Sequence, residues 1–374
     1  MKRLTAFAVA FLMLVSMCGC SKTEDASGSP TTAQTEVQMQ TVSVEETEMQ
    51  TEAEVTTNQV EESTQAPSEA EEISGELYLT VSQMVFSVVG EQEDIYCGSI
   101  PRESVVWETA DPLVAMVENG IVTAVGTGST TVSAVYQDQR VECVIGCLAD
   151  DAEALAQLSV EELSQPRKLP PMDNDAVCHF FDDAAFIGDS VSYSLMLWAT
   201  QTEQMGDATF LVRGGNGIAG YVNRYKTIGF QGKEMNIEDA VKASGVNKVF
   251  IMMGVNDLGF MSVDETMDYY RIMVDRILEL SPDVQIYVES CLPVWEAGIQ
   301  GTKNAQVEAF NAALEAYAEE MGFYFVEMAS YIEDHTGGMP EAYCSDFSTH
   351  MNYDGTDVWM QALKLYANTH GFEE

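Results

Sequence analysis

Five short apolar runs with helical periods between them dominate the C-terminal half of this 374-residue chain. Strands that alternate with helices form parallel sheets, so the pattern predicts an α/β fold with helices on both faces of a parallel sheet. Residues that serve a site in such a sheet lie just after the carboxyl ends of its strands. The expected strands lie at 185–188, 209–212, 248–253, 285–289 and 323–327, and the clearest helices at 263–280, 303–321 and 354–369.

The first run leads into Gly188-Asp189-Ser190, where a helix is expected to begin. Gly188 lets the backbone turn, and aspartate and serine favour helix starts. A serine in this place lies beside free backbone N–H groups and the positive end of a helix dipole. These surroundings would stabilise an oxyanion, so Ser190 is a candidate nucleophile. The alternative is that Ser190 only caps the helix.

Polar residues also follow the other expected strands. After the third strand comes Gly254-Val255-Asn256-Asp257, in which the Asn256 amide can donate to a developing oxyanion. The second strand is followed by a glycine-rich turn at 213–217, whose N–H groups could do the same. Before the last helix stand Asp346 and His350, an acid four residues ahead of a histidine. The order along the chain is serine, aspartate, histidine.

These four blocks, in this order, resemble the SGNH (GDSL) hydrolases, a family of esterases with a flavodoxin-like, three-layer α/β fold. The similarity covers about 183–371. The resemblance implies that Ser190 is the nucleophile and His350 the general base. It also implies an oxyanion hole formed by the Ser190 N–H, Asn256 and Gly215, with Gly217 as the alternative glycine. Such a mechanism requires no metal and no organic cofactor.

One position departs from the family pattern. The family has its acid three residues before the histidine, where this chain has Phe347, and Asp346 lies one residue further back. A one-residue bulge could bring the Asp346 carboxylate to the imidazole and complete a triad. The alternative is a Ser190–His350 dyad supported by a backbone carbonyl.

The resemblance implies a carboxylic ester hydrolase that removes O-acetyl or short acyl groups, with glycans as the expected carriers of the ester. Two other functions remain open: a surface binding protein whose hydrolase-like domain is inactive, and an acyltransferase that acts on cell-surface glycans. The G-x-S-x-G motif of α/β-hydrolases is absent around Ser190, which argues against that fold. Outside the four blocks, the polar residues His179, His335, His370 and Asn311 are expected to be structural.

The N-terminus predicts export. Two basic residues precede an apolar run at 4–17 that is too short to span a membrane. It ends in Gly19-Cys20, which resembles the lipobox of bacterial lipoproteins. The resemblance implies a signal peptide at 1–19 and a lipid on Cys20 that anchors the protein to the outer face of the bacterial membrane. An ordinary cleaved secretion signal is the alternative.

A linker is predicted at 20–74. This segment is rich in Thr, Ser, Glu and Gln and contains no aromatic residue. It cannot bury enough apolar surface to fold, and its acidic side chains repel one another. We therefore expect an extended spacer between the anchor and the folded parts.

Short alternating strands follow at 75–148 and predict a small antiparallel sandwich. The segments 106–112, 114–117 and 120–128 resemble the bacterial immunoglobulin-like group 2 domain, a spacer or adhesion module that could contact the cell wall or a glycan. Trp107 is expected in its core, with sugar stacking as the alternative. A connector with a short helical stretch near 153–163 occupies 149–175, and the hydrolase domain 176–374. The expected strands of the sandwich are 77–81, 85–88, 105–107, 114–117, 121–125, 131–135 and 141–144.

The formal net charge of −43 argues against nucleic acid and anionic lipid as partners. Export permits disulfides, although spacing does not determine their pairing. The pairs considered are Cys97 with Cys143 or Cys147, and Cys178 with Cys344. No C-x-x-C pair or histidine cluster has the spacing of zinc ligands.

Overall fold

The structure is a computed structural model that describes residues 76–296 and 302–370. The predicted signal peptide, Cys20 and the acidic linker lie outside the described residues, so lipid anchoring stays a prediction.

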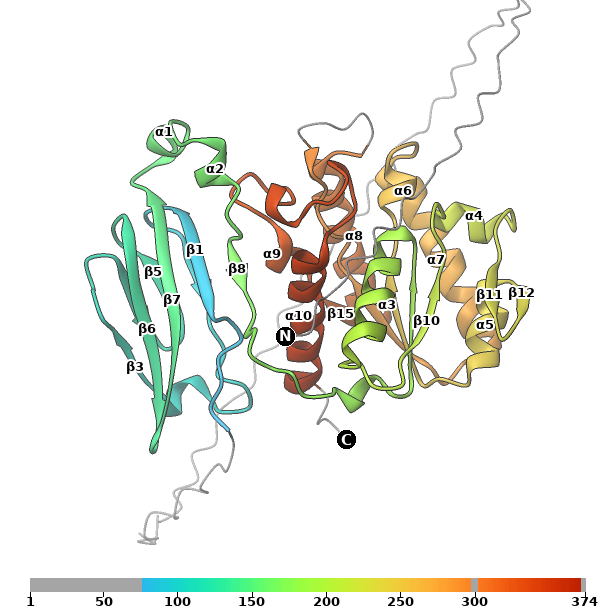
Figure 1. The fold of residues 1–374 in the computed structure, drawn as a ribbon, viewed down its shortest axis with the longest axis horizontal. Helices are drawn as coiled ribbons and strands as arrows, with labels where there is room; N and C mark the ends of the chain where they lie inside the picture. The colour runs from blue at the N-terminus through green and yellow to red at the C-terminus, as the bar shows by residue number, and fades with distance from the viewer. Residues whose placement is uncertain (1–75, 297–301, 371–374) are drawn as a thin grey trace, which may run out of the picture. The chain divides into compact units, whose positions relative to one another are not determined.

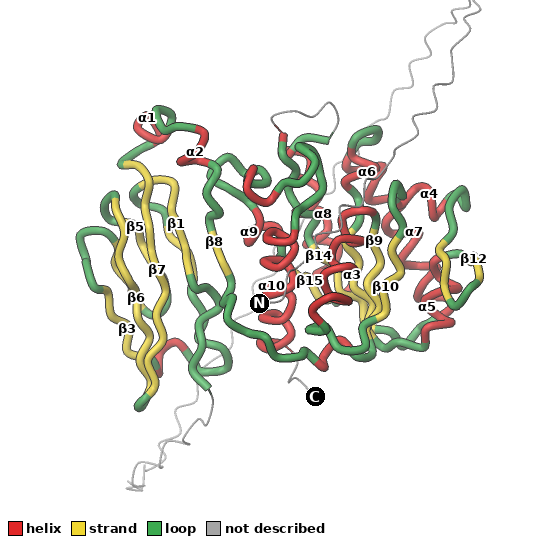
Figure 2. The backbone as a smooth tube through the Cα atoms, in the orientation of Figure 1, coloured by secondary structure: helices red, strands yellow, loops and turns green. Residues whose placement is uncertain are grey.

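The first described part, residues 76–149, consists of β-strands and one short 3-10 turn (Figures 1 and 2). One sheet has the order β3-β6-β7-β1-β8 and the other β2-β5-β4. Side chains of both sheets share one apolar cluster, which includes Phe86, Val122 and Ile145, so the sheets pack face to face as a sandwich. The strands are β1 (Gln83–Val88), β2 (Gln92–Asp94), β3 (Val106–Thr109), β4 (Ala115–Glu118), β5 (Ile121–Ala124), β6 (Gly128–Tyr136), β7 (Gln139–Ala149) and β8 (Lys168–Leu169).

The sandwich differs from the expected one in two ways. The segment 77–81 forms no strand, although its alternate residues Leu77, Leu79 and Val81 are buried. In addition, β1 pairs with β7 in parallel, so the sheet is not purely antiparallel. A hairpin turn joins β4 to β5, and its residues Asn119 and Gly120 have φ of 50° and 79°, the conformation of a type I′ turn.

The expected connector contains ordered structure. Its helical stretch consists of two short helices, α1 (Ala152–Leu155) and α2 (Val160–Leu163), and β8 pairs with β1 in the antiparallel direction. In the sandwich, Trp107 is half-buried against the apolar cluster, and its Nε1 donates to the Arg102 carbonyl at 3.2 Å. This position fits a residue at the edge of the core.

The disulfide pairs considered from the sequence are not formed. All six cysteines between 97 and 344 are free. Cys143 and Cys147 pack among the apolar side chains of the sandwich, and burial raises the pKa of the Cys143 thiol to about 12. Cys178 lies in the core of the second described part, whereas Cys344 is half-exposed. The five buried thiols therefore serve as small apolar side chains.

The second described part is the predicted α/β domain. Its five strands are all parallel and lie in the order β10-β9-β13-β14-β15, which is the flavodoxin-like order. Each strand begins and ends within one residue of the predicted range. The strands are β9 (Ala184–Gly188), β10 (Thr209–Val212), β13 (Lys248–Met252), β14 (Gln285–Glu289) and β15 (Tyr324–Val326).

Helices cover both faces of this sheet (Figure 1). α3 (Ser190–Thr202) packs on α10 (Tyr353–His370), and α7 (Val263–Leu280) packs on α5 (Ile237–Ser244) and α8 (Asn304–Met321). The capping box of Ser262 and Glu265 starts α7 at the predicted residue. Smaller elements are α4 (Ile218–Val222), α6 (Val255–Leu258), α9 (Ala329–Ile332) and the hairpin of β11 (Ile228–Phe230) and β12 (Lys233–Met235), which was not predicted. In the described ranges, no helix is long and apolar enough to cross a bilayer.

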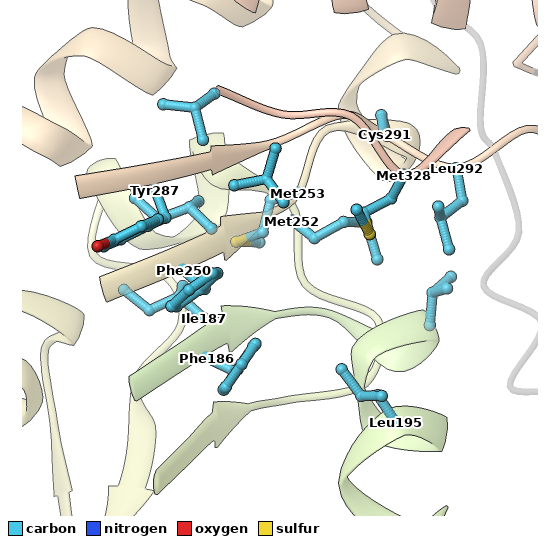
Figure 3. Close-up of a cluster of buried hydrophobic side chains, with 14 of the residues drawn as sticks. Phe186, Ile187, Leu195, Phe250, Met252, Met253, Tyr287, Cys291, Leu292 and Met328 are labelled. Carbon is cyan, nitrogen blue, oxygen red and sulfur yellow. The ribbon is translucent and has the colours of Figure 1, made fainter. Parts of the chain in front are cut away.

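A row of aromatic rings crosses the whole sheet on one face. Paired positions on neighbouring strands carry Phe210, Phe186, Phe250, Tyr287 and Tyr324. Adjacent rings stack with centroids 5.3, 4.8, 4.3 and 4.6 Å apart. Figure 3 shows three of them, Phe186, Phe250 and Tyr287, in the core. These cross-strand contacts favour the observed register of the strands.

Candidate active site

The structure brings Ser190 together with His350, which lies 160 residues further along the chain. Ser190 is the first residue of α3, and its Oγ lies 2.8 Å from Nε2 of His350. Nδ1 of the same imidazole lies 2.5 Å from Oδ2 of Asp346. The side chains of His350 and Asp346 are about one-third exposed, so solvent reaches the group. A hydroxyl, an imidazole and a carboxylate that contact one another in this spatial order form a proton-transfer chain, in which the imidazole accepts the proton of the hydroxyl and the carboxylate orients the imidazole.

A closed loop brings Asp346 to the histidine despite the extra residue. The N–H of Ser345 donates to the His350 carbonyl at 2.9 Å, and the N–H of His350 donates to Oδ1 of Asp346 at 3.2 Å. Phe347 takes up the extra residue with a φ of 55°. The backbone carbonyl considered as a support for His350 is therefore not needed, because Nδ1 already meets a carboxylate.

The start of α3 is built around Asp189. Its Oδ1 accepts from the N–H of Val191 at 2.8 Å and caps the helix. Gly188 lies so close to the side chain of Ser192 that a Cβ at position 188 would collide with the Ser192 hydroxyl. In the described ranges, the N–H of Ser190 donates to no protein group. This N–H is thus available to an oxyanion that forms on Ser190.

The glycine-rich turn approaches the serine through Gly214. A Cβ at Gly214 would lie 3.7 Å from the Ser190 Cβ, whereas one at Gly215 would meet nothing within 4 Å. Gly217 has a different reason to be glycine, since a Cβ there would lie 2.5 Å from Oδ1 of Asp257. The assignment of the oxyanion glycine to Gly215 or Gly217 stays a prediction, and Gly214 is the nearer candidate that the sequence did not single out.

Asn256 ties the blocks to one another. Its Nδ2 donates to Oδ2 of Asp189 at 2.7 Å and to the backbone carbonyl of Asn216 at 2.8 Å. These two bonds use both hydrogens of the amide. Asn256 can donate to an oxyanion only if one of them shares its hydrogen or lengthens. In this geometry the amide joins Asp189, directly before the serine, to the glycine-rich turn.

Comparison with known families agrees with this arrangement. Residues 186–358 match the GDSL-like lipase/acylhydrolase family. We refer to this part of the chain, by its similarity, as the GDSL-like domain. No curated protein matches the chain in sequence.

Several solved structures are similar to the GDSL-like domain. A GDSL-like lipase from Bacteroides thetaiotaomicron is 19% identical, with 51% of this chain and 90% of that one covered and a TM-score of 0.41. A carbohydrate esterase of family 3 from Talaromyces cellulolyticus is 16% identical, with 51% and 99% covered and a TM-score of 0.38. The catalytic domain of a peptidoglycan O-acetyltransferase from Streptococcus pneumoniae is 15% identical, with 51% and 94% covered and a TM-score of 0.37.

Two buried carboxyl groups support the site of the GDSL-like domain. Asp189 is fully buried, and burial raises its pKa to about 6, while the neighbouring His350 opposes this rise and Asp257 adds to it. Asp257 accepts from the N–H groups of Ile218 and Ala219 at 2.7 and 3.1 Å, and burial raises its pKa as well. The sequence signal for both was their place beside Ser190 and Asn256, although neither was predicted to have this role.

The acid of the predicted triad has the opposite shift. Burial tends to raise the pKa of Asp346, but the hydrogen bonds and charge of His350 outweigh burial and lower it. Asp346 is therefore ionised at neutral pH and can hold an imidazolium.

The other candidates of the GDSL-like domain lie elsewhere. His179 pairs with Asp182, His335 lies 3.0 Å from the Ser87 hydroxyl, and His370 contacts the carbonyl of Tyr366. Asn311 bonds both the N–H and the carbonyl of Cys291, at 2.7 and 2.9 Å. In the part of the chain that the structure describes, no group of three or more His, Cys, Asp or Glu side chains could hold a metal ion.

Proposed function

We propose that this protein is a serine esterase that hydrolyses O-acetyl or other short acyl esters. The observation that carries the proposal is the continuous chain from Ser190 Oγ through His350 to Asp346, with contacts of 2.8 and 2.5 Å. The three residues lie in the part of the protein that matches the GDSL-like lipase/acylhydrolase family.

The mechanism follows from the positions of these atoms. Nε2 of His350 accepts the Ser190 proton as Oγ attacks the ester carbonyl, and Asp346 stabilises the imidazolium. The imidazolium then gives its proton to the leaving alcohol, and the acyl group stays on Ser190. Water, deprotonated by His350, attacks the acyl-enzyme and releases the acid.

The tetrahedral oxyanion would lie against the free N–H of Ser190 and the glycine-rich turn at Gly214 and Gly215. Asn256 would contribute by sharing one of its amide hydrogens. A single donor of this kind is worth about 2.7–4 kcal/mol of transition-state stabilisation.

The same proposal includes a cellular location for the enzyme. Lipid on Cys20 and the acidic segment at 20–74 would hold the folded parts at the outer face of the membrane, and the sandwich would act as a spacer or as a contact to cell wall or glycan. Because the chain has a net charge of −43, its esters would be carried by a neutral glycan and not by a polyanion.

The alternative of an inactive binding protein was motivated by the displaced acid, and Asp346 meets His350 despite this displacement. Acyl transfer would use the same acyl-enzyme, with a sugar hydroxyl in place of water. Analysis of the products in the presence of an added sugar separates transfer from hydrolysis.

The central test is release of acetate from ethyl acetate by the wild type and by Ser190→Ala. We expect the variant to lose essentially all activity and all labelling by a fluorophosphonate probe. Ser281→Ala, at the C-terminal end of α7, is the matched control and should keep both. Activity of Ser190→Ala equal to that of the wild type would show that another residue is the nucleophile.

A further inference from the structure

Two aromatic side chains form a pair beside the proton-transfer chain. The rings of Trp295 and Phe347 contact each other edge to face, with centroids 5.2 Å apart and planes at 62°. Phe347 is 59% exposed, and Trp295 is half-buried. The pair thus presents aromatic surface to solvent.

Folding alone does not explain Phe347. It has a φ of 55°, a conformation that is strained for a bulky residue, and it also exposes a large apolar ring to water. A glycine would relieve the strain and an amino acid with a polar side chain would relieve the exposure. A residue that is unfavourable in two independent ways indicates a functional demand on the ring.

The pair is fixed relative to the catalytic histidine. Phe347 lies between Asp346 and His350 in the closed loop, and the N–H of Trp295 donates to the carbonyl of Ser348 in the same loop at 2.8 Å. Both aromatic residues are therefore held by the loop that carries His350.

This side of the serine is where the leaving alcohol has to be. His350 can protonate the leaving oxygen only if that oxygen comes within hydrogen-bond reach of Nε2. In a bound ester we therefore expect the alcohol part on the side of the loop at 345–350 and the carbonyl oxygen on the side of the backbone N–H groups. A group that contacts Trp295 and Phe347 belongs to the alcohol and not to the acyl chain.

The chemistry of the pair fits a sugar. A pyranose has a face of C–H groups that packs on an aromatic ring and a rim of hydroxyls that stays in water, so it suits an exposed pair. The loop also carries the hydroxyls of Ser345, Ser348 and Thr349. We infer that Trp295 and Phe347 form a binding subsite for the pyranose ring that bears the ester, an inference that rests on the proposed esterase function.

The test compares two substrates of the full-length protein: a monoacetylated methyl glucoside and ethyl acetate, which has no ring. For Trp295→Ala and Phe347→Gly, we expect the ratio of kcat/KM on the glucoside to kcat/KM on ethyl acetate to fall at least tenfold, through KM for the glucoside. Phe347→Gly suits the positive φ, so the fold should be kept or stabilised. Phe347→Tyr should retain the ratio, and so should Leu113→Ala, an exposed apolar residue of the sandwich.

Two results would overturn the subsite. One is a ratio that stays within twofold of wild type in both variants. The other is an equal loss on both esters, which would mean that the pair only shapes the loop. Calorimetry on Ser190→Ala measures binding of the glucoside ester without turnover. Adding the Trp295→Ala substitution should weaken this binding tenfold. Unchanged binding would contradict the subsite. Failure of the wild type to cleave either ester would instead contradict the esterase function.

Discussion

Asn256 donates to the carboxylate of Asp189 at 2.7 Å, across 67 residues of sequence. The same carboxylate caps α3 at the residue before Ser190, so one group orders the serine and the amide together. This relationship places a buried acid at the centre of the site without contact to the reacting atoms.

Asp189→Asn should therefore lower activity without unfolding the protein. The variant keeps the shape of the side chain but replaces one of its two acceptor oxygens with an NH2 group. The asparagine therefore cannot accept from both Val191 and Asn256 as the aspartate does. Because loss of one oxyanion donor costs on the order of 10²–10³ in kcat, we expect a loss of tenfold or more. Steady-state kinetics on ethyl acetate measure it. Asp283→Asn, on the exposed turn before β14, is the control, and an equal change in both variants would contradict this role.

Asp346→Asn tests whether the displaced acid works as the third member of the triad. An amide can hold the imidazole but favours the wrong tautomer and leaves the imidazolium without a counter-charge. We expect kcat to fall by roughly two to four orders of magnitude, as for the comparable change in a serine protease triad. Circular dichroism should show an unchanged fold. A variant within threefold of wild type would support the dyad instead.

Glu289 predicts a pH dependence of stability. It is 1% exposed at the end of β14, it accepts from Nε1 of Trp359 at 3.0 Å, and burial raises its pKa to about 8. The folded protein therefore keeps a proton that the unfolded chain releases near its ordinary pKa of 4.5. This contribution is fully present below pH 4.5 and is lost as the pH rises to about 8.

Glu289→Gln isolates this contribution, because glutamine accepts from Trp359 and does not titrate. Urea denaturation between pH 5 and 8 should show a free energy of unfolding that falls with pH more steeply in the wild type, by roughly 1 kcal/mol per pH unit. Parallel curves for the two proteins would show that Glu289 does not titrate in this range.

Gly217→Ala tests the contact between the glycine-rich turn and Asp257. The new Cβ would lie 2.5 Å from Oδ1 of a carboxylate that two backbone N–H groups hold in place. We expect a loss of about 1–3 kcal/mol in the free energy of unfolding. Gly229→Ala in β11 is the control, since its Cβ would lie 3.4 Å from the flexible end of Glu234. Equal stability of both variants would remove the steric argument.

Sequence patterns predicted the α/β domain well because its signals are local. An apolar run of four to six residues predicts a strand, and a helical period such as that at 263–280 predicts a helix. The hairpin of β11 and β12 was missed because its strands have three residues each and no apolar period. The expected strand at 77–81 has the right alternation, but alternation does not reveal whether a partner strand is present.

The sequence by itself determined the parallel α/β architecture, the order of the blocks that carry chemistry and the identity of Ser190 and His350 as the leading candidates. Local periodicity and short motifs are sufficient for these. Only the tertiary structure decided that Asp346 reaches His350, that the cysteines stay free and that Gly214 faces the serine. It also decided that Asn256 donates both amide hydrogens, to Asp189 and to Asn216. The contact of Asp346 with His350 depends on the backbone of the closed loop at 345–350, and the others depend on distances between segments that are remote in sequence.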